Sequence, residues 1–126
     1  MRVNVTAQGI VGRDPELTFS KNGKPWVKFP IAVTERIKEN NEWKDGNTTW
    51  FDVIAWNTTA EAVAEYVSKG NRVVVVGSLK RQDWEARDGT PKVTLEIAAE
   101  TVGLAPFAPK GGQPRAVSKQ QTEAPF

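Results

Sequence analysis

Short strand-like segments separated by tight-turn signals run through the first hundred residues of this chain. Asn22-Gly23 and Asp88-Gly89 are dipeptides that readily adopt the positive φ angles of hairpin turns. Around them, apolar and polar residues alternate with the period of two that is typical of a strand with one buried face, and only segment 58–70 has helical periodicity. One helix is too few for a parallel α/β sheet, and its presence makes an immunoglobulin-like sandwich less natural. The pattern therefore predicts an all-β fold.

The expected elements follow one another as three strands, one helix and two further strands that are extended by a hairpin. Strands are predicted over 3–11, 25–36, 47–57, 72–87 and 92–102. Thr58-Thr-Ala-Glu61 predicts a capping box at the start of the helix, Gly70 is expected to end it, and the polar segment 37–46 is expected to be a mobile loop. This order is that of the oligonucleotide/oligosaccharide-binding (OB) fold, a five-stranded Greek-key barrel with one helix between strands three and four, here with an extended β-hairpin.

The composition excludes several classes of function. The chain has no Cys and no His, so it lacks thiol nucleophiles, histidine acid–base groups and the usual zinc ligands. Asp14, Asp52 and Asp83 form no recognisable metal-binding or acid–base set, so we expect neither an enzyme nor a bound metal or cofactor. The sequence has no signal-peptide pattern and no apolar stretch of membrane-spanning length, and a cytoplasmic protein with no membrane partner is expected.

The net charge of +2 is unevenly distributed along the chain. Residues 1–105 carry 14 Lys and Arg against 14 Asp and Glu, whereas residues 106–126 carry 3 against 1. The second segment is also rich in proline, glycine and polar residues, so we expect a globular domain over 1–105 and a flexible tail over 106–126. A neutral domain that binds a polyanion needs a local basic groove and contacts other than charge.

The five tryptophans all fall outside the expected aliphatic core. Trp50 and Trp56 share one strand face with an aspartate, and the apolar set of the same strand lies on the other face. Trp26 also lies on the mixed face of its strand. Trp84 lies among the charged residues of a hairpin arm, and Trp43 lies in the expected polar loop.

Exposed aromatic rings interleaved with cations suit single-stranded nucleic acid, because each base can stack on a ring and each stack contributes about 1 to 3 kcal/mol. Trp50 and Trp56, about 20 Å apart along a strand, would then serve different nucleotides. The candidate nucleic-acid-binding residues are Trp50, Trp56, Trp84, Trp26, Trp43, Lys28, Lys80, Arg81 and Arg87. Aromatic residues also occur at subunit interfaces, which leaves a scaffold or interaction protein open, and RNA and oligosaccharide are alternative ligands for the same rings.

Several motifs together resemble the bacterial-type single-stranded DNA-binding proteins over nearly all of residues 3–103. The resemblance is carried by segments 11–16 (VGRDPE), 50–56 (WFDVIAW), 62–70 (AVAEYVSKG) and 74–79 (VVVGSL), together with Asn22-Gly23 and Trp84. Segment 42–46 (EWKDG) is similar to the same segment in actinobacterial members of the family. This similarity indicates that the protein comes from such a bacterium or from a phage that infects one. The resemblance implies an OB fold, usually a homotetramer, that wraps single-stranded DNA without sequence preference in replication, recombination and repair, in the cytoplasm and associated with the nucleoid.

The resemblance also assigns roles to individual positions. Trp50, Trp56 and Trp84 match positions at which members of the family stack bases on aromatic side chains. Ile37 stands where some members carry another stacking tryptophan. Asp52 replaces what is often a basic residue, which lowers the expected phosphate affinity of that strand.

The last residues resemble the partner-docking tip of the family. Family tails end in several acidic residues followed by Pro-Phe, and the segment 122–126 (TEAPF) keeps the Pro-Phe pair with a single acidic residue. The resemblance therefore implies that Glu123, Pro125 and Phe126 bind proteins of DNA metabolism. In the family an acidic tail competes with DNA, and a tail of net charge +2 is expected to do so poorly.

Overall fold

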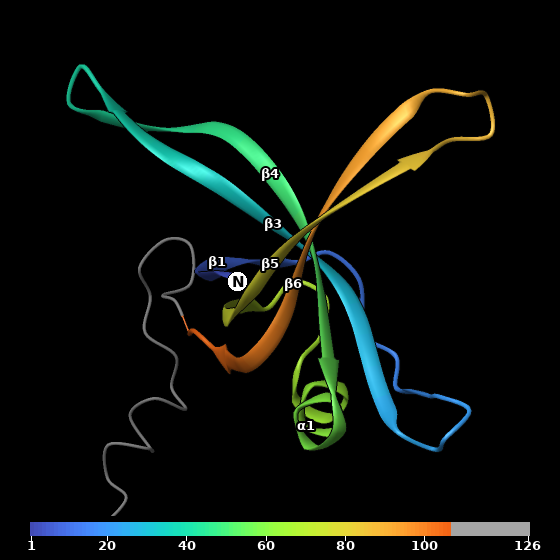
Figure 1. Ribbon diagram of the computed structural model, residues 1–126. Coiled ribbons are helices and arrows are strands. Elements are labelled where there is room, and N and C mark those ends of the chain that lie inside the picture. Colours follow the sequence, from blue (N-terminus) through green and yellow to red (C-terminus); the bar gives the residue numbers. More distant parts are fainter. Residues whose placement is uncertain (107–126) are drawn as a thin grey trace, which may run out of the picture.

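A computed structural model describes residues 1–106 of the chain, and Figure 1 shows how its strands and its helix are arranged. The elements are β1 (Val3–Val11), β2 (Thr18–Phe19), β3 (Pro25–Glu39), β4 (Glu42–Trp56), α1 (Asn57–Tyr66), β5 (Arg72–Glu85) and β6 (Pro91–Leu104). The described part of the chain is mostly strand with a single helix, which confirms the all-β prediction. Counted over the five long strands, α1 follows the third and precedes the fourth, as predicted.

The five long strands pair into a ring. β1 pairs with β5, β5 with β6, β6 with β4, and β4 with β3. A short β1–β3 pairing, with Ile10 opposite Ala32 and Val11 opposite Ile31, closes the ring. Among these pairs only β4 and β6 run parallel, and this order is the Greek-key order of the predicted OB fold. β2 adds two residues at the edge of β3.

Two hairpin arms extend beyond the ring and diverge from each other in Figure 1, one built by β3 and β4 and the other by β5 and β6. The prediction of a mobile loop over 37–46 is wrong, because β3 continues to Glu39 and β4 already begins at Glu42. Asn40 and Asn41, with φ of 53° and 63°, form the two-residue turn between them, since asparagine tolerates the left-handed region that such a turn needs. The segment is polar because both faces of the arm are exposed.

The core lies inside the ring and beneath α1. Val27, Phe29 and Ile31 of β3 and Val53 and Ala55 of β4 are fully buried, in the alternation that the sequence predicts. The other fully buried residues are Val73 and Val75 of β5, Ile97 of β6 and Ala60 of α1. Because a shift of one residue would turn these side chains toward solvent, their burial fixes the register and holds the residues between them on the outer face.

The start of α1 differs from the prediction. Trp56 at the end of β4 is the N-cap residue, and its side chain makes no capping hydrogen bond. Asn57 has a φ of 57°, so the chain turns directly from the strand into the helix. The predicted capping box is wrong, because Thr58 already lies inside the first turn and cannot cap it.

The end of α1 also differs from the prediction. The helix ends at Tyr66, before Gly70. Gly70, with a φ of 91°, instead turns the chain toward β5, and its N–H donates to the carbonyl of Val11 at 2.8 Å. The N–H of Val11 in turn donates to the carbonyl of Asn71 at 2.9 Å, so this turn ties the end of β1 to the start of β5.

Candidate nucleic-acid interface

The outer face of β3 and β4 carries three of the tryptophans. Residues opposite each other in a ladder share a face, because side chains alternate along each strand. The outward pairs are Trp26 with Trp56, Lys28 with Ile54, Pro30 with Asp52, and Ala32 with Trp50. We call these residues the tryptophan face. They lie between the buried core residues of both strands, so the predicted position of these tryptophans outside the core is confirmed.

Trp26 and Trp56 contact each other at one end of the tryptophan face. Their ring centroids are 6.1 Å apart and their planes are tilted by 39°. This separation is in the range of favourable aromatic pairs. Trp26 is half-buried, whereas Trp56 is 44% exposed, so Trp26 packs beside an indole that remains accessible.

Trp50 lies at the other end of the tryptophan face, near the point where β1 meets β3. It stands opposite Ala32, whose small side chain covers little of the indole, and it is 57% exposed. The outer edge of its ring lies beside Gly12, the residue that follows β1. Trp50 and Trp56 are therefore two separate accessible rings on one strand.

A β-bulge in the β3–β4 arm decides on which face Trp43 lies. Thr34 lies opposite Thr48, and their hydroxyls form a 2.8 Å hydrogen bond, but Arg36 lies opposite Asp45. β4 thus has one extra residue between these pairs, and the alternation along β4 is shifted by one. Simple alternation would place Trp43 and Trp50 on opposite faces, whereas the bulge brings Trp43 to the side of the tryptophan face.

Trp43 has a cationic neighbour on the arm. It lies opposite Lys38 and is 61% exposed. The guanidinium of Arg36 lies 6.0 Å from the centre of the Trp43 ring, at the limit of a cation–π contact. Arg36 Nε also lies 3.6 Å from Asp45 Oδ1, which offsets part of its charge.

Trp84 reaches the same outer surface from the other arm. Asp52 lies opposite Glu96, and Glu96 lies opposite Lys80, so these three residues form one row across β4, β6 and β5. Trp84 follows Lys80 by four residues in a regular part of β5 and therefore lies on the same side. Its Nε1 donates to Thr94 Oγ1 at 2.9 Å, which orients an indole that is 52% exposed.

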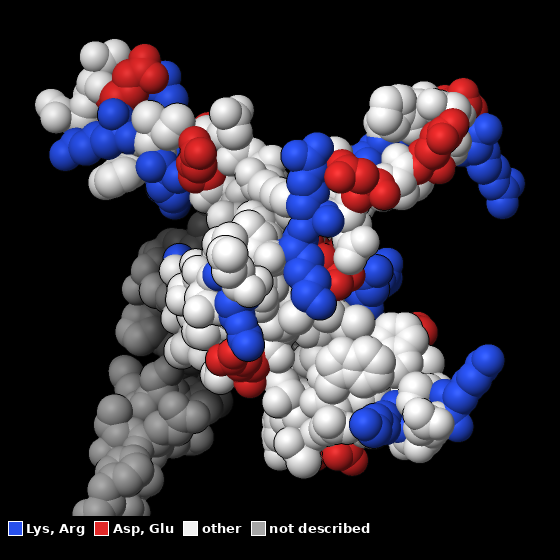
Figure 2. Space-filling model, in the orientation of Figure 1, with Lys and Arg blue, Asp and Glu red and all other residues white. Residues whose placement is uncertain are grey.

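Lys28 stands between two carboxylates on the tryptophan face. Its Nζ lies 3.9 Å from Asp52 Oδ2 and 3.7 Å from Glu96 Oε2. The sequence drew attention to Asp52 but not to Glu96, which reaches this place through the parallel β4–β6 pairing. A phosphate at this position would meet at least as much negative as positive charge. Figure 2 shows positive and negative side chains interspersed over the visible face.

The other predicted cations lie on the β5–β6 arm. Within residues 1–106, Lys80 and Arg87 form no ion pair with a carboxylate. Arg81 alternates with Lys80 and so lies on the opposite face of the strand, where its Nε is 3.1 Å from Asp83 Oδ1. At the tip, hydrogen bonds from the Thr90 hydroxyl and N–H lower the pKa of the Asp88 carboxyl, which stays ionised next to Arg87.

Arg13 borders the tryptophan face although the sequence did not single it out. Its Nη2 donates to the carbonyl of Lys28 at 3.4 Å, which places the guanidinium beside β3. Within the described residues it forms no ion pair with a carboxylate. The residue stands in the segment 11–16 that carried the resemblance, but its position depends on the path of the chain after β1, which no local pattern gives.

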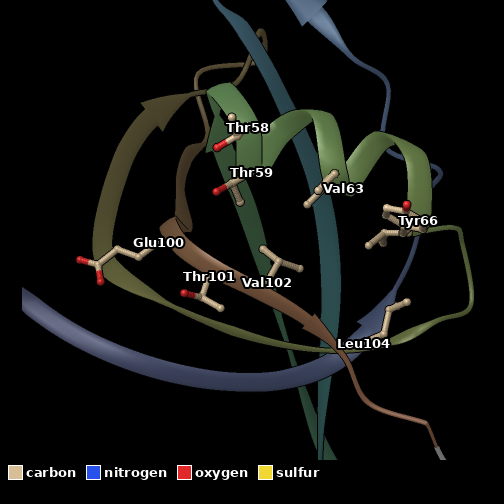
Figure 3. A pocket seen from close by; sticks show the side chains of 10 residues that line it. Thr58, Thr59, Val63, Tyr66, Glu100, Thr101, Val102 and Leu104 are labelled. Carbon is tan, nitrogen blue, oxygen red and sulfur yellow. The ribbon is translucent and has the colours of Figure 1, made fainter.

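A cavity of about 500 Å³ opens between α1 and the end of β6, and Figure 3 shows the side chains that line it. The labelled lining residues are Thr58, Thr59, Val63, Tyr66, Glu100, Thr101, Val102 and Leu104. No tryptophan and none of the predicted cations lines it. The cavity is therefore separate from the candidate interface.

The sequence also led to predictions about a metal site, a membrane-spanning segment and the C-terminal tail. Within residues 1–106, no cluster of three or more acidic side chains is placed to hold a metal ion. In the same part of the chain, no helix is long and apolar enough to cross a membrane. Glu123, Pro125 and Phe126, with the tail from residue 107 onward, lie outside the described residues.

Comparison with known proteins agrees with this geometry. The model of the single-strand binding protein family matches residues 3–105. The chain belongs to this family. Membership confirms the resemblance seen in the sequence, and it confirms that the chain belongs among binding proteins and not among enzymes.

Relatives of the chain come from actinobacteria. A single-stranded DNA-binding protein of Corynebacterium glutamicum is 40% identical over 102 residues, which cover 79% of this chain and 45% of that protein. A protein of the same name from Mycobacterium leprae is 37% identical over 101 residues, covering 79% of this chain and 60% of that protein. The chain thus spans about half the length of the curated relatives it matches.

A solved structure supports the fold. The crystal structure of the small single-stranded DNA-binding protein from Streptomyces coelicolor matches with a TM-score of 0.76 and 30% sequence identity. The match covers 83% of this chain and 95% of that chain. The family's fold is therefore shared over nearly all of the described residues.

Proposed function

We propose that this chain binds single-stranded DNA without sequence preference by stacking bases on its outer tryptophans. The observation that carries the proposal is the placement of Trp26, Trp50 and Trp56 on one face of β3 and β4, with Trp84 on the same side of β5. The names of the relatives support DNA as the ligand. A duplex hides the faces of its bases, so stacking of this kind selects single strands.

Stacking has to supply most of the affinity, because the charges on the tryptophan face nearly cancel. Asp52 and Glu96 flank Lys28, so we place the sugar–phosphate backbone at the borders of the face. The cations that would contact it are Arg13 beside β3, Lys80 in the row across β4, β6 and β5, and Arg87 at the tip of the β5–β6 arm. Three phosphate contacts by single-stranded DNA correspond to a slope of log K against log salt of about −2, which is shallow for a DNA-binding protein.

Trp43 and Arg36 extend the proposed interface along the β3–β4 arm. The bulge places Trp43 on the side of the tryptophan face, and its exposed ring offers a further stacking position. Arg81 contributes least among the predicted cations, because it lies on the other side of β5 and is paired with Asp83.

We further propose that the protein acts in DNA replication, recombination and repair as a cytoplasmic, nucleoid-associated homotetramer. The family resemblance supports these roles. In the same proposal, Glu123, Pro125 and Phe126 recruit proteins of DNA metabolism. Deleting residues 123–126 is expected to abolish binding of such partners and to leave single-stranded DNA binding unchanged.

Anisotropy titrations of end-labelled oligonucleotides test the proposed ligand. Labelled oligo(dT) and a mixed-sequence single strand should bind with similar affinity, and a duplex of equal length should bind much more weakly. An RNA oligomer and an oligosaccharide serve as competitors in the same assay. Equal binding of the duplex, or displacement by the sugar but not by single-stranded DNA, would refute the proposal. Absence of any binding would favour a scaffold protein with its aromatic residues in subunit contacts.

A further inference from the structure

We propose that Gly12 is a positioning residue for Trp50, keeping free the space that the edge of the indole occupies at the junction of β1 and β3. The inference deepens the proposed function, because it concerns how one of the proposed stacking rings is held. It also gives a role to Gly12, the glycine of segment 11–16, whose presence the proposed stacking residues alone do not explain.

The contact between the two residues is close. A methyl group added to Gly12 would lie 2.9 Å from Cζ3 and 3.3 Å from Cη2 of Trp50. It would also lie 3.4 Å from Cγ of Pro30, which belongs to the tryptophan face. The outer edge of the indole therefore occupies the place where any other residue would carry its β-carbon.

The backbone at Gly12 is held in place independently of Trp50. The N–H of Gly12 donates to the carbonyl of Pro30 at 2.9 Å. The preceding residue, Val11, is 1% exposed and donates its N–H to Asn71 at 2.9 Å. Gly12 does not have a positive φ, so its backbone conformation suits an alanine.

Trp50 is the part of this contact that can move. Its side chain is 57% exposed, and it makes the contact with the far edge of its ring. Two other glycines contrast with Gly12, because a methyl group at Gly9 or Gly77 would collide with the backbone carbonyl of Ala32 or Ala98. A methyl group at Gly12 would instead push the Trp50 ring away from the β1–β3 junction and leave the strands where they are.

A double-mutant cycle tests this inference. The variants Gly12→Ala, Trp50→Ala and the double variant are titrated with labelled oligo(dT), and thermal unfolding of each is recorded. Loss of one stacked base should weaken binding by about 5- to 150-fold for Trp50→Ala. We expect Gly12→Ala to unfold at the same temperature as the parent and to bind at least about threefold more weakly, because the displaced ring stacks less well. In the Trp50→Ala background, Gly12→Ala should have no further effect.

Two further variants sharpen the test. Gly103→Ala is the matched control, because a methyl group there would meet nothing within 4 Å, and it should bind like the parent. Trp50→Phe lacks the ring edge that carries Cζ3 and Cη2, so Gly12→Ala should lose its effect in that background.

Four results would overturn the inference. Parental affinity of Gly12→Ala, or an equal loss in the Trp50→Ala background, would show that Gly12 does not act through Trp50. A lowered unfolding temperature for Gly12→Ala would show that the strands, and not the ring, take up the methyl group. If Trp50→Ala itself binds like the parent, the stacking role proposed for Trp50 fails, and the inference fails with it.

Discussion

Trp26 and Trp56 lie opposite each other in the β3–β4 ladder, with ring centroids 6.1 Å apart and planes tilted by 39°. The two rings have different surroundings, because Trp26 is half-buried and Trp56 is 44% exposed. This difference divides their roles. We propose that Trp56 offers the accessible surface for a base and that Trp26 supports the Trp56 ring from the side.

The unequal exposure of the pair predicts unequal effects of truncation. Trp56→Ala should weaken binding of oligo(dT) by about 5- to 150-fold, the value of one stacked base, with little change in the free energy of unfolding. Trp26→Ala should both weaken binding and lower the unfolding temperature, because it removes a partly buried ring. Anisotropy and thermal unfolding of both variants check this. Equal loss of stability in the two variants would contradict the division of roles.

We expect Asp52 to limit the affinity of the tryptophan face for single-stranded DNA. Asp52→Asn removes one of the two carboxylates beside Lys28 Nζ, the one at 3.9 Å, and leaves Glu96 at 3.7 Å as its single negative neighbour, so the lysine contacts a phosphate more readily. We expect tighter binding at low salt and a steeper salt slope, by about −0.7 for one added phosphate contact. Glu100→Gln is the control, because it removes a carboxylate whose ion pair, with Arg2, lies outside the tryptophan face. The prediction is wrong if both substitutions change binding equally.

Trp43 lies on the arm at some distance from the other rings. Trp43 precedes Trp50 by seven positions along β4, which corresponds to about 20 Å. Trp43→Ala should therefore weaken binding of a long oligo(dT) and leave binding of a short one unchanged, whereas Trp50→Ala should weaken both. Titration with a series of oligonucleotide lengths measures this difference. A Trp43→Ala effect that does not depend on length would place this ring outside the proposed path.

The hydrogen bond from Trp84 to Thr94 predicts an effect on the orientation of the indole. Thr94→Val removes the acceptor of the 2.9 Å bond and keeps the shape of the side chain. Binding should weaken, but less than in Trp84→Ala, because the ring remains present in a less fixed orientation. Thr101→Val, which lines the cavity beside α1, provides the matched control and should bind like the parent. Parental affinity of Thr94→Val would show that the bond does not contribute to binding.

The sequence predicted the parts of the fold that depend on local pattern. The alternation that buries Val27, Phe29 and Val53 also placed Trp26 and Trp56 outside the core. The prediction of a loop over 37–46 is wrong, because an exposed hairpin arm has the same polar composition as a loop. The dipeptide Asn40-Asn41 is the sequence signal for the turn, because asparagine tolerates the positive φ that both residues adopt.

The parts of the site that could not be predicted depend on pairing between distant strands. Glu96 reaches Lys28 only through the parallel β4–β6 ladder. The face of Trp43 depends on a bulge whose extra residue has no distinct sequence signal. Gly12 meets Trp50 because the chain passes the tryptophan face after β1, and a glycine in a short motif does not reveal that contact.

Intrinsic tryptophan fluorescence during titration with a long oligo(dT), at low and at high salt, tests the central claim most directly. Stacking on the outer rings predicts strong quenching that saturates at a defined ratio of nucleotide to protein. High salt should weaken this binding with the shallow slope expected of few phosphate contacts. Unchanged fluorescence at both salt concentrations would contradict the claim, because rings that contact bases cannot keep the same environment when the strand binds.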